Sequence, residues 1–368
     1  MMEPREIKPD ELEALALGTG ILGTGGGTHP YLELLNLKKL QREKRRIRVV
    51  APDSLKDDAL VAEIGFMGAP LISKERLPDP SMLSRALVSM ERFAGVRFSA
   101  VMSSEIGGEN GLAPMTVAAL HDLPIIDADP RGRAFPEMQM SSFVIAGLPL
   151  YPTALADVRK NDMIIAKSQN AGWTERIGRK LCVETGSVLA TCRPPRTGRQ
   201  IKDSAIHGSI SRAIRLGASI LDARREHGDP IEAIINNESA TLLFDGKVVD
   251  VERRTAGGFV RGSTKIVATD KREGSTLTID FQNEFSLARF GDEVLAMVPD
   301  LICVLDRATG EAVGTETIRY GMRVAVLVLD APAALKTVEA LRVVGPKAFG
   351  YDMKYRPHSG YKEKCEVV

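Results

Sequence analysis

The chain has 368 residues, of which 44% are hydrophobic and 26% are charged, and its formal net charge is +1. This length is enough for two domains or one large one, and the near-zero charge gives no indication of a nucleic-acid partner. The sequence has no apolar run long enough to span a bilayer and no signal-like start, so we expect a cytoplasmic protein without a membrane partner. Its four cysteines form no CxxC pair, which favours reduced thiols that pack as small hydrophobic residues.

The first half of the sequence alternates between helix-like and strand-like segments. The spacing of apolar residues predicts helices over 8–22, 31–44, 79–95 and 112–122. Strand-like runs are found at 46–50, 59–70, 98–103, 123–130 and 162–168. Such alternation predicts an α/β region with a mostly parallel sheet and helices packed against it.

The second half has a different texture. Two helices are predicted over 173–184 and 207–225, and from about Ala240 the segments become short, rich in β-branched residues and separated by DG, GG, EG and TG turns. This pattern is typical of antiparallel β structure. We therefore predict an α/β domain over residues 1–168 and a C-terminal domain over 169–368, with helices followed mainly by strands.

The segment GTGILGTGGGTHPY, residues 18–31, has six glycines in its first ten positions. Gly18, Gly20 and Gly23 match the pattern GxGxxG, but a helix-like segment precedes them where a dinucleotide site needs a strand. The chain also has no Walker motif. Because no strand precedes the glycines, we expect neither NAD nor FAD. We interpret the segment as a loop between two helices.

This glycine loop has two possible roles. The backbone amides of Gly25, Gly26, Gly27 and Thr28 would suit a carbonyl, an oxyanion or a carboxylate at the start of the next helix. Alternatively, the glycines allow helices to pack closely against the sheet.

Ligands of parallel α/β sheets bind beyond the carboxyl ends of the strands, and three predicted strands end in suitable groups. One end has Gly65 and Gly68, which allow close approach, and the other two carry polar residues. Candidate groups for this edge are Glu105, Asn110, Asp127, Asp129, Arg133 and Glu137. Asp127 and Asp129 are two positions apart, so they share a face if the strand is still extended there. Two adjacent carboxyls would raise one pKa and so provide an acid and a base. A turn or helix cap is the alternative role for either aspartate.

Two further predictions concern the C-terminal half and a metal. Gln282, Asn283 and Glu284 lie between aromatic residues, and form either the far wall of an interdomain cleft or a self-satisfied turn. A divalent metal is possible, with His29, Asp127 and Asp129 as candidate ligands. Oxygen ligands favour Mg²⁺ or Mn²⁺, and Zn²⁺ would fit if His29 takes part.

Eight stretches run in order along nearly the whole chain and match one known family: GILGTGGGTHPY, GGENGLAPM, DADPRGRAFPEMQM, GGFVRG, DFQNE, PDLICVLD, RYGMRVAVLVL and GPKAFGYDMKY. On these stretches the sequence resembles the S-methyl thiohydantoin desulfurase family. The resemblance implies an N-terminal α/β domain and a β-rich C-terminal domain. It also implies hydrolysis of an S-alkylated thiohydantoin to a hydantoin with release of a thiol. The chain departs from the usual family pattern at Thr28 and His29 and at Pro130 and Arg131.

The expected activity is therefore hydrolysis of a small five-membered cyclic substrate by water attack at ring carbon C2. Asp127 or Asp129 would accept the proton of the water, with Glu105 as the rival base. The amides of 25–27, Asn110 and Arg133 would stabilise the developing charge. Arg131 or Arg133 would alternatively bind a carboxylate tail of the substrate.

Two other functions remain open at this point. The chain could be a non-catalytic subunit of a hydantoin- or oxoproline-processing complex, or an ATP-dependent component of one. Apolar strands also give a weak indication of a homo-oligomer.

Overall fold

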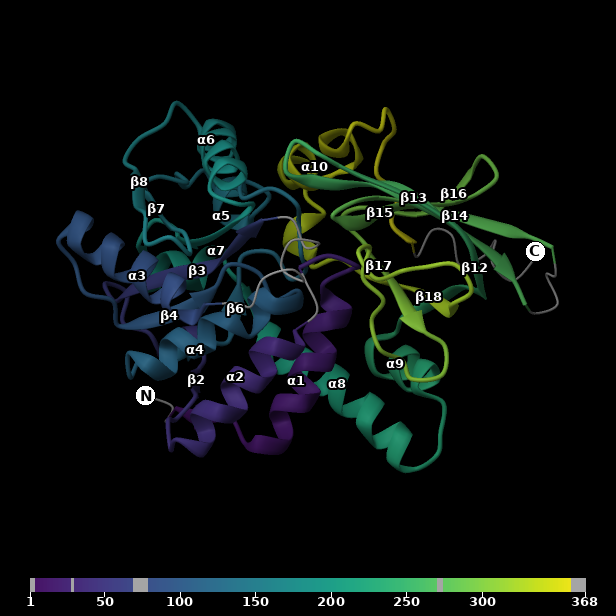
Figure 1. Cartoon of the computed structure of the whole chain (residues 1–368), viewed down its shortest axis with the longest axis horizontal. Coiled ribbons are helices and arrows are strands. Elements are labelled where there is room, and N and C mark those ends of the chain that lie inside the picture. The colour runs from purple at the N-terminus through teal and green to yellow at the C-terminus, as the bar shows by residue number, and fades with distance from the viewer. Residues whose placement is uncertain (1–3, 28–29, 69–78, 270–273, 359–368) are drawn as a thin grey trace.

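The computed structural model describes residues 4–27, 30–68, 79–269 and 274–358. Two β-sheets lie side by side, and helices cover the first sheet and fill the angle between the two (Figure 1). The first sheet and its helices come mainly from the N-terminal half, and the second sheet comes from the C-terminal half.

The first sheet is mixed, with a parallel centre. Among the described residues it has nine strands in the order β1-β2-β5-β4-β3-β9-β7-β8, with β10 beside β3. Neighbouring strands are parallel from β2 to β3, and the flanking pairs are antiparallel. The strands are β1 (Arg5–Glu6), β2 (Arg48–Val50), β3 (Leu60–Gly68), β4 (Ala100–Ser103), β5 (Ile125–Ile126), β7 (Thr153–Ala156), β8 (Asp162–Ile165), β9 (Val188–Cys192) and β10 (Arg196–Thr197).

A separate pair of short strands, β6 (Ala128–Asp129) and β11 (Ile206–His207), lies beside this sheet. The helices of this half and of the connection to the second sheet are α1 (Pro9–Leu22), α2 (Tyr31–Arg42), α3 (Pro80–Ala94), α4 (Ala113–Leu120), α5 (Ser142–Ile145), α6 (Ala171–Glu184), α7 (Gly198–Ser204), α8 (Ser209–Arg225) and α9 (Pro230–Glu238).

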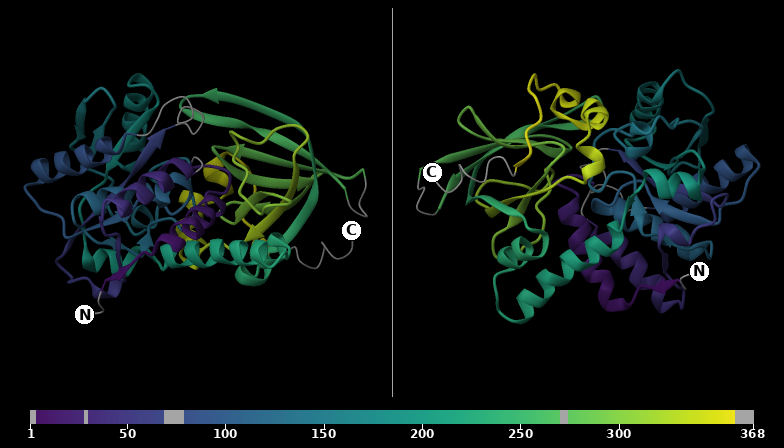
Figure 2. Two further views of the ribbon diagram at one scale, coloured as in Figure 1. Left: turned by 60° about the horizontal axis from the view of Figure 1, so that its bottom comes forward. Right: turned by 180° about the vertical axis from the view of Figure 1, so that it is seen from behind.

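Helices α1 and α8 pack at very short range because glycines stand at their contact. A side chain at Gly18 would collide with the backbone of Ala213, and one at Gly217 would collide with the backbone of Ala14. Gly18 and Gly20 therefore lie inside a packed helix and not in a ligand loop. The contact ties α8, which leads toward the second sheet, to the first helix of the chain (Figure 2).

The second sheet is antiparallel and curved (Figure 2). Its seven strands in the described residues follow the order β16-β15-β14-β13-β12-β18-β17. They are β12 (Thr241–Ala256), β13 (Phe259–Ala268), β14 (Thr276–Gln282), β15 (Glu284–Phe290), β16 (Glu293–Met297), β17 (Leu301–Asp306) and β18 (Arg323–Leu329). Helix α10 (Val338–Val344) follows the last strand.

The predicted fold class is confirmed: an α/β region precedes a β-rich antiparallel one. The first sheet also includes β9 and β10, which follow residue 168 in the sequence. The division of the chain at that residue therefore stays a prediction. In the described part of the chain, no helix has the length and apolarity needed to cross a membrane.

Candidate functional site

A polar cavity lies where the loops of the first sheet meet the β14–β15 turn of the second. It encloses about 570 Å³ of space when its open mouth is included. Its walls are formed by Gly27, Phe66, Met67, Gly68, Glu105, Glu109, Asn110, Arg131, Phe135, Pro136, Glu137, Met138, Arg179, Val188, Arg193, Asn283 and Glu284. Three carboxyl groups, Glu105, Glu109 and Glu284, are almost fully buried there.

The glycine loop is the point where the two sheets join. The carbonyl oxygens of Thr24 and Gly25 accept hydrogen bonds from the backbone N–H groups of Phe285 (2.8 Å) and Thr315 (2.7 Å) in the C-terminal half. A side chain at Gly26 would collide with the carboxyl of Glu284. These glycines are needed because another backbone and a buried carboxyl approach the loop closely.

The same loop also contacts the segment after β4. The carbonyl oxygen of Gly27 accepts a hydrogen bond from the N–H of Glu109 at 2.7 Å. Gly27 and Gly108 both have positive φ, at 74° and 63°. A side chain on Gly108 would collide with the backbone of Gly27, and one on Gly27 would collide with the carbonyl of Gly107. Of the glycines predicted to bind substrate, Gly27 lines the cavity, and Gly25 and Gly26 are not among its lining residues.

Glu105 is held in place by three donors. Its Oε2 accepts hydrogen bonds from Nη1 of Arg131 at 2.5 Å and from the N–H of Phe135 at 3.2 Å. Its Oε1 accepts one from Nδ2 of Asn110 at 2.7 Å. Asn110 also bonds both the N–H and the carbonyl of Phe66, so it fixes Glu105 against the end of β3. The guanidinium and the N–H groups stabilise the negative charge of Glu105.

Arg131 has little freedom to bind a substrate carboxylate. Besides Glu105, it donates hydrogen bonds to the carbonyl oxygens of Phe135, Glu137 and Met138, each at 3.2 Å. It therefore positions Glu105 and shapes the cavity wall.

Glu284 has the opposite environment. It begins β15 directly after the β14–β15 turn, where Asn283 has a φ of 58°. Its side chain is fully buried, and its Oε2 has no hydrogen-bond partner among the described residues. Burial raises the pKa of Glu284 well above its usual value, and the negative charge of Glu105 raises it further, against the lowering effect of Arg133. The direction of this shift favours the protonated form of Glu284.

Arg133 is fully buried and joins the two halves of the chain. It donates hydrogen bonds to the carbonyl oxygens of Pro299 (3.0 Å) and Asp300 (2.7 Å), and to Oγ1 of Thr24 (2.8 Å). Burial lowers its pKa to about 10, and the charge of Glu284 is the largest opposing influence. Arg133 is not a lining residue of the cavity, so these contacts describe a structural role.

Asp129 organises the loop that carries Arg131. Its Oδ2 accepts hydrogen bonds from the N–H groups of Ile106 and Arg131 (each 3.0 Å) and Gly132 (2.9 Å). Its pKa is raised to about 6 by burial, which outweighs these bonds. The shift was expected to come from pairing with Asp127, and burial is the actual cause.

Asp127 caps a helix. Its Oδ1 accepts hydrogen bonds from the N–H groups of Ile210 (2.8 Å) and Ser211 (3.1 Å) at the start of α8, and its Oδ2 accepts one from the Ser211 hydroxyl at 2.5 Å. Such a cap satisfies N–H groups that the helix leaves unpaired. Asp127 and Asp129 thus have separate partners, because the extended strand is interrupted at residue 127, between β5 and β6.

The cavity brings together several of the residues predicted from the sequence, namely Glu105, Asn110, Glu137, Asn283, Glu284 and Gly27. Gln282 instead lines a second hollow on the C-terminal sheet. The predicted Thr28 and His29 lie outside the described residues. Neither aspartate of the predicted metal site belongs to a group with metal-ligand spacing in the described chain.

Sequence reasoning did not anticipate Arg193. This residue is buried at the cavity and pairs with Glu63 of β3, with 2.5 Å between Nη1 and Oε1. It stands between β9, whose sequence is VLATC, and a Pro-Pro pair, and this short run with β-branched residues was the available signal for a strand. Burial lowers the pKa of Arg193, and the charge of Glu63 opposes this.

Comparison with known proteins covers most of the chain. Residues 10–167 match the family model described as S-Me-THD-like, N-terminal domain, and residues 168–358 match that described as S-Me-THD-like, C-terminal domain. The fold is also similar to the crystal structure of a protein from Chromobacterium violaceum. That structure has a TM-score of 0.80 and 23% identity, covering 96% of this chain and all of the other. The two family matches span nearly the whole sequence, and the chain belongs to the S-Me-THD-like family, as the resemblance to S-methyl thiohydantoin desulfurases indicated.

Proposed function

We propose that the protein is an enzyme that hydrolyses an S-methyl thiohydantoin to the hydantoin and methanethiol. The observation that carries the proposal is a pair of buried carboxyl groups in one cavity with opposite surroundings. Glu105 faces a guanidinium and two N–H donors, whereas Oε2 of Glu284 has no partner in the described residues. Carboxyls with such unequal environments act as a base and an acid at the same pH. Membership of the S-Me-THD-like family supports the substrate class.

In the proposed reaction, the oxygen of a water molecule bonds to ring carbon C2. Glu105 accepts one proton of that water, and Glu284 donates its proton to the adjacent ring nitrogen, which takes up the electron pair of the C=N bond. When the tetrahedral intermediate collapses, the C2–S bond breaks. The hydroxyl proton returns to Glu284, and the proton on Glu105 passes to the departing sulfur. One proton of the water thus ends on methanethiol, and the other replaces the proton that Glu284 gave to the ring nitrogen.

Other groups at the cavity position these carboxyls. Asn110 and Arg131 fix Glu105 by hydrogen bonds to both of its oxygens. Gly26 allows Glu284 to lie against the glycine loop, where any larger residue would displace it. Because this polar site is largely shielded from water, charge that develops on the substrate would interact strongly with the fixed donors.

Methanethiol release tests the proposal directly. The purified full chain is incubated with a panel of S-methyl thiohydantoins that differ in their ring side chain, without ATP and with or without a chelator. We expect release without ATP, and a loss of about 10²- to 10⁴-fold in Glu284→Gln, because the amide cannot donate the proton. Glu339→Gln, the same change on the exposed face of α10, is the matched control and should keep full activity.

The proposal fails if no member of the panel releases a thiol, or if Glu284→Gln and Glu105→Gln both turn over at the wild-type rate. Tight binding of a plain hydantoin without turnover of any thiohydantoin would instead identify a non-catalytic subunit. Release only in the presence of ATP would identify an ATP-dependent component.

A further inference from the structure

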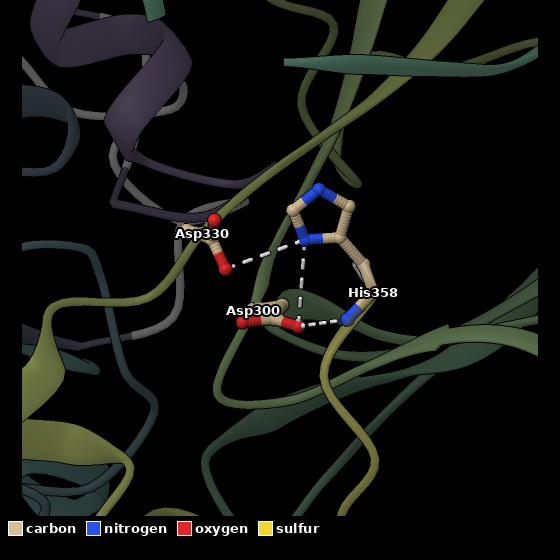
Figure 3. A group of neighbouring side chains, drawn as sticks. All are labelled: Asp300, Asp330 and His358. Carbon is tan, nitrogen blue, oxygen red and sulfur yellow. Dashed lines mark hydrogen bonds and ion pairs between the residues drawn. The ribbon is translucent and has the colours of Figure 1, made fainter. Parts of the chain in front are cut away.

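A second group of chemically active side chains lies outside the cavity wall. Asp300 precedes β17, Asp330 follows β18, and His358 lies near the C-terminus (Figure 3). The two strands are neighbours, so the aspartates lie at one end of the strand pair and the chain returns to place the imidazole beside them. None of the three residues lines the cavity that contains Glu105 and Glu284.

The spacing of the three side chains suits a bound cation. Nδ1 of His358 lies 3.5 Å from Oδ1 of Asp330 and 3.8 Å from Oδ2 of Asp300. One ligand atom from each of the three residues can be chosen so that all lie within 4.8 Å of one another. Ligand atoms about 2.0–2.2 Å from a common Zn²⁺ are separated by roughly 3.3–4 Å, so both measured separations fit a shared ion.

The imidazole is buried without a hydrogen bond. The side chain of His358 has 1% of its surface exposed, and within the described chain neither ring nitrogen has a hydrogen-bond partner. Both carboxylate distances are longer than an N–H···O bond, so direct bonding does not account for this orientation. A polar ring buried in this way costs free energy unless a further group satisfies it.

The remaining contacts prepare the carboxylates for this role. Asp300 accepts hydrogen bonds from the N–H groups of Ala331 (3.1 Å) and His358 (2.9 Å), and from the hydroxyl of Tyr355 (2.9 Å). Such outer contacts orient a metal-binding carboxylate.

Asp330 has one competing partner. Nζ of Lys336 lies 2.5 Å from its Oδ1. Asp330 is about half exposed, so its side chain has room to offer its oxygens to an ion while Lys336 stays near by. The two carboxylates and the lysine together give the group a net charge of −1 with a neutral imidazole, which favours a divalent cation.

We propose that Asp300, Asp330 and His358 form a binding site for a divalent transition metal, with Zn²⁺ as the ion that suits one imidazole and two carboxylates. Water would complete the coordination on the exposed side of Asp330. The ion would fasten the C-terminal segment to the ends of β17 and β18. The site differs from the predicted metal centre at His29, Asp127 and Asp129, and it does not depend on the proposed hydrolase activity.

Zn²⁺ titration of the full chain, freed of metal by a chelator, tests this site. We expect one equivalent to bind and to raise the thermal unfolding midpoint. Asp330→Asn and His358→Gln should each weaken Zn²⁺ binding at least about 100-fold, more than the loss of an outer partner usually causes. Mg²⁺ should bind far more weakly, because it prefers oxygen ligands alone. The exposed Asp352→Asn and His227→Gln are matched controls that should bind as the wild type does.

Two results would overturn the site. One is the absence of Zn²⁺ binding to the folded wild-type chain, and the other is binding that keeps its affinity in both Asp330→Asn and His358→Gln. Should His358→Gln fail to fold, Asp330→Asn decides the question, because Asp330 is half exposed and its replacement leaves the buried contacts of Asp300 intact. Metal binding and thiol release are read separately, so either proposal can fail without the other.

Discussion

The buried carboxyl groups on the two walls of the cavity differ in their hydrogen-bond partners. On the first-sheet side, Glu105 and Arg131 form an ion pair, and further hydrogen bonds join Glu105 to Asn110 and the N–H of Phe135 and join Arg131 to three backbone carbonyls. On the second-sheet side, Glu284 is equally buried but has an oxygen without a partner in the described chain. An ion pair fixes the geometry of its two side chains, whereas a buried carboxyl without a charged partner keeps its proton and can donate it to a substrate. The contrast separates residues that build the site from one that is available for chemistry.

Arg133 is the residue on which both walls depend, and its replacement should have the largest effect. We expect Arg133→Met to lower the free energy of unfolding by about 3–5 kcal/mol, because it leaves the buried carbonyls of Pro299 and Asp300 and the hydroxyl of Thr24 without their charged donor. Chemical denaturation monitored by circular dichroism measures this loss. Arg254→Met, on an exposed part of β12, is the control and should change stability by less than about 0.5 kcal/mol. A loss of similar size in both variants would contradict the bridging role.

The difference between the two walls can be measured with one pair of isosteric changes. Glu105→Gln should cost about 2–3 kcal/mol of stability at pH 6–7, because it leaves the Arg131 charge without its carboxylate. Glu284→Gln should cost less than about 1 kcal/mol, since burial favours the neutral form of the wild-type carboxyl. Denaturant midpoints of the two variants provide the comparison. Equal losses would show that both carboxyls are charged, and would remove the basis for distinguishing the two walls.

Only part of this site can be predicted from the sequence. Polar residues that interrupt apolar runs mark candidate site positions in the sequence. This signal identified the strand end with Glu105 and Asn110 and the FQNE turn with Glu284. Asp127 and Asp129 were assigned to one face because side chains alternate along a strand, and this rule fails where β5 ends at Ile126 and β6 begins at Ala128. The rule needs a continuous strand, and local sequence does not reveal the break.

The tertiary contacts were beyond sequence reasoning for a different reason. Gly18 was assigned by pattern to a loop motif, but its role is set by Ala213 in a helix far along the chain. Likewise, whether Glu284 is charged depends on burial and on Glu105, which comes from the other sheet. Such properties belong to packing between distant segments, and a single sequence contains no measure of it.

A third buried carboxyl, Glu33 of α2, extends the comparison to a group whose partners are neutral. Its oxygens accept hydrogen bonds from Asn36 (3.2 Å) and Thr116 (3.4 Å), and burial raises its pKa to about 7. Because the folded-state pKa is above the unfolded one, the stability from Glu33 is fully present below about pH 4.5 and is lost as pH rises through 7. Glu33→Gln should therefore change stability by less than about 1 kcal/mol at pH 5 and raise it by about 3 kcal/mol at pH 8.5.

Unfolding midpoints measured from pH 5 to pH 8.5 test the Glu33 prediction. Glu43→Gln, at the exposed end of the same helix, should follow the wild-type curve. Parallel curves for the wild type and Glu33→Gln over the whole range would show that Glu33 is charged in the folded protein at pH 5 as well. The conclusion that burial raises the pKa of Glu33 would then have to be abandoned.

Asp127 provides the smallest and most discriminating change, because the sequence favoured it as a catalytic base and the structure makes it a helix cap. Asp127→Asn keeps an acceptor for the N–H groups of Ile210 and Ser211, so it should cost only about 1 kcal/mol of stability. Thiol release should stay near the wild-type rate under conditions where the variant is folded. The loss of a cap lowers the folded fraction but leaves the chemistry of the cavity unchanged. A fall of 10²-fold or more in the rate of thiol release by a fully folded Asp127→Asn would therefore identify Asp127 as the catalytic base.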